Sequence, residues 1–237
     1  MDFINRWANS EHVKIHFLES DDYDKRLTPL VYVPGALNYA EQSVELLQEF
    51  ESRRSISISL RGRGKSDKPT LGYSFADHVK DIEAVIMHSQ VQKYCPMAYS
   101  MGVPYTLKFA SNSSEIKGLI LCDYPAKYPS IPESWSERVL RSSYTNKQTK
   151  HVVEGIQKES QSITLYNELK QIQVPVLIIK GGTDGSLLSE VEAEKYNDNL
   201  QNVIVKEIVD SGHELWESEK ERFLQLTKDF LVRLDNS

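Results

Sequence analysis

Short runs of apolar residues alternate with stretches of helical periodicity along most of the chain. Several runs are nearly continuous in apolar residues, a pattern typical of parallel strands that are covered on both faces. Apolar residues recur at helical spacing in residues 75–86 and again near the end, from Phe223 to Leu234. This alternation predicts an α/β fold with a doubly wound, mostly parallel sheet flanked by helices. The expected strands cover residues 12–18, 30–33, 55–60, 94–99, 118–122, 175–180 and 202–209.

The alternation stops after residue 122 and resumes near residue 173. The intervening segment opens with three prolines and continues with polar sequence of helical character. A loop of that length without secondary structure is unusual inside a compact domain. We therefore expect a small helical cap over residues 123–172, inserted into a core that is formed by residues 1–122 and 173–237.

Composition and charge exclude several classes of protein. The 237 residues suffice for one domain with a sizeable core. A formal net charge of −6 and scattered Lys and Arg residues argue against a nucleic-acid partner. The polar start is unlike a signal peptide, and no apolar run is long enough for a membrane span. Cys95 and Cys122 lie within or beside apolar runs, which favours reduced buried thiols, and no metal-ligand spacing occurs. The expectation is a cytoplasmic monomer or weak oligomer that needs no metal or cofactor.

Ser100 lies where a predicted strand ends and a helix begins. In the sequence AYSMG, the small residues Ala98 and Gly102 stand two positions before and two positions after it. A sharp strand–turn–helix raises a serine hydroxyl above the sheet and directs the N–H groups of the helix start towards it. The usual pattern is G-x-S-x-G, so Ala98 adds one methyl group. A lone serine in a turn is more often structural, and its hydroxyl becomes a nucleophile only beside a base.

His213 follows the last predicted strand, in the sequence DSGHELWE, and precedes the final helix. Imidazole is suited to remove a serine proton near neutral pH. Gly212 allows the backbone to turn at this point, and the other five histidines have no comparable setting. His213 is therefore the predicted base.

Two aspartates are candidates for the carboxylate that orients the imidazole and stabilises its cation. Asp184 lies in the glycine-rich sequence GGTDGSLL after residues 175–180, and Asp123 directly follows residues 118–122. Asp184 could instead cap the helix that follows it. We favour Asp184 as the acid, with Asp123 as the second candidate.

The segment PGALNYA after residues 30–33 presents backbone N–H groups at the end of another strand. Acyl transfer needs such donors for the negative charge that develops on the carbonyl oxygen. Ala36 is the first predicted donor, and Met101, directly after the serine, is the second. An ordinary Pro-Gly turn is the alternative for the PGA sequence. The turn, the serine, the acid and the base all fall at predicted strand ends on one edge of the sheet, where open α/β sheets bind ligands.

Five segments resemble the α/β-hydrolase superfamily over nearly the whole chain: VPGAL, SLRGRGKSDKP, AYSMG, PVLIIKGGTD and SGHELWE. The resemblance implies an eight-stranded type of sheet and a small cap over the site. It assigns the triad to Ser100, Asp184 and His213, and the oxyanion hole to Ala36 and Met101. The R-G-x-G-x-S-x-x-P pattern of residues 61–69 is expected to shape a loop beside the site rather than to bind phosphate. The chain departs from common family residues at Pro34, Ser59, Ala98 and Val103, so no subfamily follows.

The expected activity is that of a serine esterase, which cleaves a carboxylic ester or related acyl bond of a small molecule through an acyl-enzyme. Dehalogenases and epoxide hydrolases of this fold use an aspartate at the elbow and are disfavoured. An acyltransferase, a carbon–carbon hydrolase or lyase, and a perhydrolase use the same triad, and some members are non-catalytic small-molecule receptors. The pocket is expected to be lined by Leu37, Tyr99, Tyr124, Tyr128, Trp135 and Tyr144, with plain packing as the alternative for the aromatic side chains.

Overall fold

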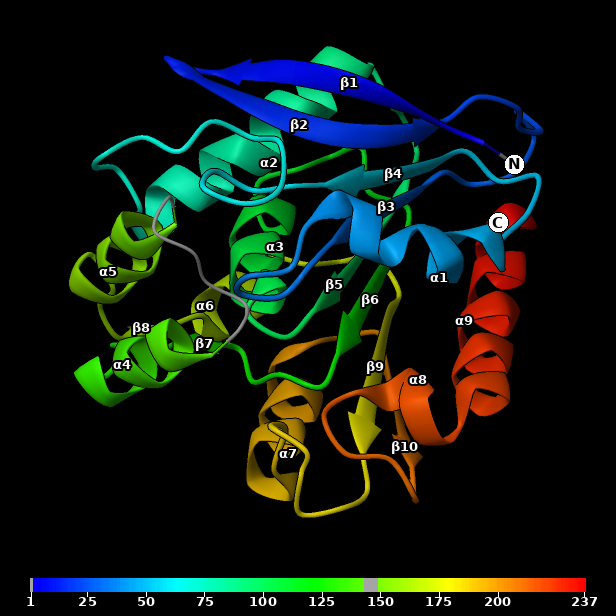
Figure 1. Ribbon diagram of the computed structural model, residues 1–237. Helices are drawn as coiled ribbons and strands as arrows, with labels where there is room; N and C mark the ends of the chain where they lie inside the picture. Colours follow the sequence, from blue (N-terminus) through cyan, green and yellow to red (C-terminus); the bar gives the residue numbers. More distant parts are fainter. Residues whose placement is uncertain (1, 143–148) are drawn as a thin grey trace.

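The computed structural model describes residues 2–142 and 149–237 and has an eight-stranded sheet at its centre (Figure 1). In the first half of the sheet the spatial order is β1 (Phe3–Ser10), β2 (Val13–Ser20), β4 (Ser55–Ile58) and β3 (Leu30–Val33). The second half continues with β5 (Cys95–Tyr99), β6 (Leu119–Cys122), β9 (Val176–Gly181) and β10 (Val203–Ile208). Strand β2 is antiparallel to both neighbours, and the other pairings are parallel. The predicted fold class, a mostly parallel α/β sheet, is confirmed.

Strand β1 is the strand of the main sheet that the apolar pattern did not predict. Of its eight residues only Ala8 and Ser10 are buried. It is an edge strand that pairs with β2 through a tight turn, in which Glu11 has a φ of 55°. An edge strand with one solvated face needs no continuous apolar run. Each of the seven predicted strands ends within two residues of the observed bounds.

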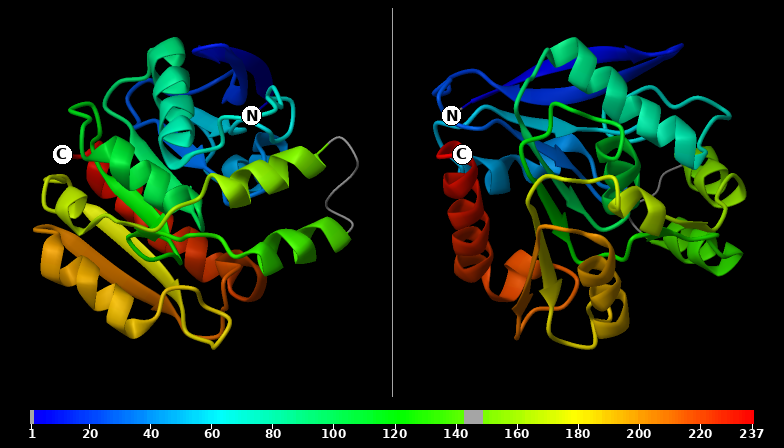
Figure 2. Two further views of the ribbon diagram at one scale, coloured as in Figure 1. Left: turned by 90° about the vertical axis from the view of Figure 1, so that its left-hand side faces the viewer. Right: turned by 180° about the vertical axis from the view of Figure 1, so that it is seen from behind.

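Helices cover both faces of the sheet (Figure 2). One face carries α2 (Phe75–Ser89), α3 (Gly102–Ala110) and α7 (Glu190–Asn199), and the other carries α1 (Val44–Gln48) and α9 (Lys220–Asp235). The side chains of β3 alternate between the two cores. Val31 and Val33 pack on the α2 side, whereas Leu30 and Tyr32 pack on the α9 side. This division explains why the parallel strands are apolar at consecutive positions.

Residues 123–172, which we call the cap segment, leave the sheet after β6 and return to it at β9. Helices α4 and α5 lie side by side and project beyond the sheet (Figure 2). Strands β7 and β8 form a small antiparallel sheet of their own, which is too short to leave a pattern in the sequence. The elements of the segment are β7 (Lys127–Tyr128), α4 (Glu133–Arg141), α5 (Lys150–Lys158), β8 (Ile163–Thr164) and α6 (Tyr166–Leu169).

The cap segment packs on the loop between β4 and α2. A Cβ atom added to Gly155 of α5 would lie 2.5 Å from the ring of Tyr73, so only glycine allows this approach. On the other side of the contact, Gly62 has a φ of +81° and faces Val152. The loop that contains residues 61–69 is therefore held between the sheet and the cap segment.

The carboxylate of Asp235 binds the end of α9 to the residues that precede β3 and β4. It accepts hydrogen bonds from the backbone N–H of Thr28 at 2.7 Å and from both terminal nitrogens of Arg53 at 2.9 and 2.7 Å. The paired side chains of Arg53 and Asp235 are only 8% and 12% exposed. Burial alone would raise the pKa of Asp235, but these hydrogen bonds hold it below its ordinary value of 3.8.

We expect Asp235→Asn to lower the free energy of unfolding by about 3 kcal/mol at neutral pH, because it leaves the Arg53 charge buried without its partner. A carboxyl group with a lowered pKa stabilises the fold above its unfolded pKa, and this contribution is lost as the pH falls through the folded pKa. The difference between wild type and variant should therefore shrink below about pH 4. Urea unfolding at neutral and acid pH measures it, with Asp229→Asn on the exposed side of α9 as control. A difference that is absent at neutral pH or grows on acidification contradicts this prediction.

Candidate active site

Ser100 occupies the sharp corner between β5 and α3. Its φ is 53°, in the left-handed region that residues with a side chain rarely adopt. The corner is fixed by two backbone hydrogen bonds, from the N–H of Ser100 to the carbonyl of Cys122 at 3.1 Å and from the N–H of Val103 to the carbonyl of Ser100 at 2.9 Å. A Cβ atom at Gly102 would lie 2.5 Å from the carbonyl oxygen of Val33. A glycine two positions after the serine therefore lets α3 start directly against the end of β3.

His213 lies in the loop between β10 and α8 (Leu215–Ser218), and its imidazole reaches Ser100. The Nε2 atom is 2.8 Å from the Ser100 Oγ. The imidazole stacks on the ring of Tyr99, with centroids 4.8 Å apart and an angle of 25° between the rings. The His213 side chain is 24% exposed, so its ring edge remains open to solvent while its position is held.

The imidazole finds its carboxylate in Asp123, at the carboxyl end of β6. The Nδ1 atom of His213 is 2.8 Å from the Asp123 Oδ2. The Asp123 side chain is fully buried, and it also accepts hydrogen bonds from the Ser186 hydroxyl at 2.5 Å and from the N–H groups of Gly181 and Leu187 at 3.0 and 2.9 Å. Burial would raise the pKa of Asp123, but the hydrogen bonds from His213 and these three donors lower it. The carboxylate is therefore ionised at neutral pH.

This geometry corrects the prediction that Asp184 is the partner of the imidazole. Asp184 is exposed in the loop after β9. That loop supplies donors to Asp123, through Gly181, Ser186 and Leu187, instead of supplying the carboxylate itself. Strand β6 lies between β5 and β9 in the sheet, so the residue after it is closer to the end of the serine strand. The second candidate of the sequence analysis, Asp123, is the residue that the structure brings to His213.

The predicted oxyanion turn lies beside Ser100. A Cβ atom at Gly35 would be 3.0 Å from the Ser100 Cβ, so the turn after β3 passes directly over the serine. Within residues 2–142 and 149–237, neither the N–H of Ala36 nor that of Met101 donates a hydrogen bond. Two backbone donors next to a serine hydroxyl are thus available to a ligand. The carbonyl of Ala36, by contrast, is engaged by the Arg63 Nε at 2.8 Å.

The predicted pocket residues divide between the two cores. Leu37, Tyr124 and Trp135 are partly buried against the core on the α2 side, where the cap segment lies. Tyr128 is fully buried in that core, with its ring beside Phe75 and Tyr105. Tyr99 belongs to the other core and contacts the imidazole, so it supports His213 rather than facing the cap segment. Tyr144 lies outside the described residues.

Other binding capacities are limited in the part of the chain that the structure describes. There, no group of three or more His, Cys, Asp or Glu side chains is arranged to hold a metal ion, and no helix is long and apolar enough to cross a membrane. Cys95 and Cys122 are buried free thiols. Burial raises the pKa of both thiols well above the usual value, which makes them unreactive as nucleophiles at neutral pH.

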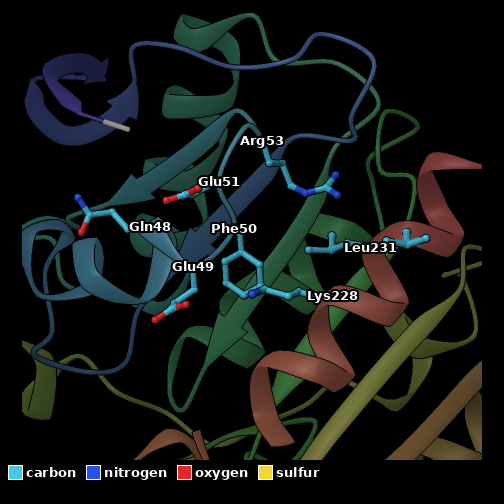
Figure 3. Close-up of a pocket in the computed structure, with 8 residues that line it drawn as sticks. Gln48, Glu49, Phe50, Glu51, Arg53, Lys228 and Leu231 are labelled. Carbon is cyan, nitrogen blue, oxygen red and sulfur yellow. The ribbon is translucent and has the colours of Figure 1, made fainter. Parts of the chain in front are cut away.

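A groove of about 560 Å³ lies between the segment that precedes β4 and helix α9 (Figure 3). Side chains of both charge signs gather around it, including Glu49, Glu51 and Lys228. Arg53, on its wall, is paired with Asp235. The residues that line the groove come from the end of α1, the segment before β4 and helix α9, and they do not include Ser100.

A serine, a histidine and an aspartate that meet at the carboxyl ends of a mostly parallel sheet define a class of α/β proteins with a nucleophile elbow. Residues 28–141 match the family model described as alpha/beta hydrolase fold. The AB hydrolase superfamily protein YisY of Bacillus subtilis (strain 168) is 28% identical over 131 residues, a match that covers 52% of this chain and only 47% of that relative. The chain therefore has the α/β-hydrolase fold, with the family match confined to residues 28–141.

Solved structures of the same fold superimpose over almost the whole chain. MGS-M2, an alpha/beta hydrolase enzyme from a Medee basin deep-sea metagenome library, has a TM-score of 0.84 at 15% identity, with 96% of this chain and 97% of that chain covered. The esterase EaEST from Exiguobacterium antarcticum has a TM-score of 0.80 at 20% identity, with 97% and 100% covered. At these identities the likeness establishes the fold, and the chemistry must be argued from the site itself.

Proposed function

We propose that the protein is a serine hydrolase in which Ser100 is the nucleophile, His213 the general base and Asp123 the acid that orients it. The observation that carries this proposal is the continuous hydrogen-bonded chain from Ser100 Oγ through the imidazole to Asp123, with both links at 2.8 Å. A serine hydroxyl is a weak nucleophile without such a base, and a buried ionised carboxylate favours the imidazole tautomer that accepts at Nε2.

The proposed reaction follows from this arrangement. His213 Nε2 takes the hydroxyl proton as Ser100 Oγ bonds to the ester carbonyl carbon, and the carbonyl electron pair moves to oxygen. The N–H groups of Ala36 and Met101 bind this oxyanion. The imidazolium then gives its proton to the leaving alcohol, which departs and leaves an acyl group on Ser100. Water, deprotonated by the same imidazole, releases the acid and restores the enzyme.

The proposed substrate is a small-molecule carboxylic ester. Leu37, Tyr124 and Trp135 are partly buried apolar and aromatic side chains on the cap side of the core, and on this proposal they line the space for an acyl group of modest size. The esterase EaEST supports the choice of an ester because it shares the fold over nearly its whole length. On this proposal the cap segment, residues 123–172, closes the site over the substrate.

The test is turnover of p-nitrophenyl esters graded by acyl length, measured with the wild-type protein. We expect release of p-nitrophenol with a clear preference for one acyl length, at a rate well above that of the uncatalysed reaction. Negligible turnover of every ester, together with a rise in melting temperature on adding an ester or its product, would instead indicate a non-catalytic receptor.

A further inference from the structure

Arg63 is a buried cation that has no ion-pair partner among the residues that the structure describes. Its residue is only 3% exposed. The Nε atom donates to the carbonyl of Ala36, and Nη1 donates to the carbonyl of Arg61 at 2.6 Å and to the Nε2 of His78 at 2.7 Å. All of these acceptors are neutral. The remaining nitrogen, Nη2, is buried and has no hydrogen-bond partner.

His78 cannot supply the missing negative charge, and it remains an uncharged acceptor. Its Nδ1 is 2.7 Å from the carbonyl of Ser74 and donates to it, which leaves the lone pair of Nε2 for Arg63. Burial lowers the pKa of His78 well below its usual value, and the neighbouring Arg63 cation lowers it further.

The nearby carboxylates serve Arg61 instead. Asp81 is fully buried and binds the Arg61 side chain at 2.6 Å, and Asp77 lies 3.5 Å from the same guanidinium. No ion pair of the described residues includes Arg63, and residues 143–148 contain no Asp or Glu in the sequence. A guanidinium stays protonated even when burial lowers its pKa, so Arg63 is a buried charge without a direct ion pair, on which Asp81 acts only at longer range.

Two tyrosine hydroxyls extend this set of unpaired donors. Tyr105, one turn after the start of α3, stacks on the ring of His78 at 4.8 Å, and Tyr128 of β7 lies 5.4 Å from the Tyr105 ring. The two hydroxyls interact with each other, and neither has a partner outside this pair. Burial raises the pKa of both, so both keep their protons. The Arg63 charge acts on both hydroxyls, so these three buried groups lie in one region of the core and lack an acceptor outside their own set.

This donor set adjoins the site of the proposed reaction. Arg63 holds the carbonyl of Ala36, the residue whose N–H is a proposed oxyanion donor, and Gly35 approaches Ser100 to within contact distance. Tyr105 stands on the helix that begins beside Ser100, and Tyr128 comes from the cap segment. The donor set is thus linked to Ser100 through the turn of Gly35 and Ala36.

We propose that the substrate carries a carboxylate, which binds the Arg63 Nη2 and the hydroxyls of Tyr105 and Tyr128. This inference rests on the proposed function and specifies its substrate as a carboxylated ester, such as the half-ester of a short dicarboxylic acid. A carboxylate supplies both the negative charge and the several acceptor positions that these donors lack. In this structure the three donor atoms are shielded from solvent. Binding requires the Tyr128 ring to shift from its contacts with Phe75 and Tyr105, so that its hydroxyl lies beside the carboxylate.

The experiment compares matched anionic and neutral esters. One pair places the carboxylate on the acyl group, p-nitrophenyl hydrogen glutarate against p-nitrophenyl pentanoate. A second pair places it on the leaving group, para-acetoxybenzoate against phenyl acetate. For one of the two pairs we expect kcat/KM to favour the anionic ester, and Arg63→Met to reduce that preference by about 10- to 100-fold. Lys65→Met removes the same charge from an exposed side chain of the same loop and should leave the preference unchanged.

Further variants distinguish a loss of carboxylate binding from a structural effect of replacing Arg63. Tyr105→Phe and Tyr128→Phe each remove only a hydroxyl, and each should lower the anionic preference several-fold while neutral-ester turnover persists. Calorimetry with glutarate should detect binding to the Ser100→Ala protein that is lost when Arg63→Met is added. A wild type that prefers neutral esters in both pairs, or an equal loss on both esters of each pair in all three variants, overturns the inference and leaves the serine hydrolase proposal intact. Glutarate binding without turnover of any ester would support the carboxylate site and contradict the serine hydrolase proposal.

Discussion

Replacing Ser100 with Ala is expected to lower kcat/KM for a good p-nitrophenyl ester by about 10⁴-fold or more. The hydroxyl is the atom that attacks the carbonyl carbon on the proposed pathway, and it contacts His213 at 2.8 Å. No other group of the described triad can take over this bond-forming role. The measurement is steady-state turnover of the purified wild type and variant at equal protein concentration, where the concentration is determined by a method that does not depend on the active site.

Two checks accompany this result. Ser111→Ala, at the other end of α3, removes a hydroxyl that bonds only to the carbonyl of Lys108, and it should leave turnover unchanged. Melting curves should show the Ser100→Ala protein folded, because the φ of 53° at this corner disfavours alanine no more than serine. Turnover of the Ser100→Ala protein close to that of the wild type would place the nucleophile elsewhere.

The second large effect separates the two aspartates. Asp123→Asn is expected to lower kcat by about 10⁴-fold, because an amide in place of the carboxylate favours the wrong imidazole tautomer and leaves the imidazolium unpaired. Asp184→Asn should change kcat less than about two-fold, since this side chain is exposed and the imidazole is already bound to Asp123. Both variants remove one negative charge and keep the side-chain shape, so each is the matched control of the other.

The reverse result for the two aspartates would contradict the assignment of Asp123. If Asp184→Asn abolished turnover and Asp123→Asn did not, the hydrogen bond between His213 and Asp123 would be structural only, and the acid would be the residue first favoured by the sequence. Because Asp123 also receives hydrogen bonds from Ser186, Gly181 and Leu187, the melting temperature of Asp123→Asn must be measured as well. A soluble, folded and inactive variant is the expected result.

The fold was predictable for those elements whose burial produces a periodic pattern of apolar residues in the sequence. The parallel strands show apolar residues at consecutive positions because their side chains pack alternately in the two cores. In β3, Val31 and Val33 pack in one core, and Leu30 and Tyr32 pack in the other. Strand β1 was missed because it lies at the edge of the sheet with most side chains in solvent. The strands β7 and β8 of the cap segment were missed because two residues cannot establish a pattern.

For the candidate site, the sequence predicted at which strand ends the candidate residues lie but not which side chains meet. Ser100 and His213 were singled out by their turns, and the structure brings them together. The sequence favoured Asp184 because two aspartates follow buried strands, and only the lateral order of β6 and β9 decides which one contacts the imidazole. Arg63 was treated as part of a structural loop motif. Its role as an unpaired cation depends on Asp81 binding Arg61 instead, which no spacing in the sequence reveals.

The most direct test of the central claim is to map the residue modified by a fluorophosphonate, which reacts with an activated serine and mimics the tetrahedral intermediate. Peptide mass spectrometry of the labelled wild type should find one adduct, on Ser100, and labelling should disappear in Ser100→Ala and fall strongly in His213→Ala. An adduct on another residue, or labelling of Ser100 that does not depend on His213, would contradict the account.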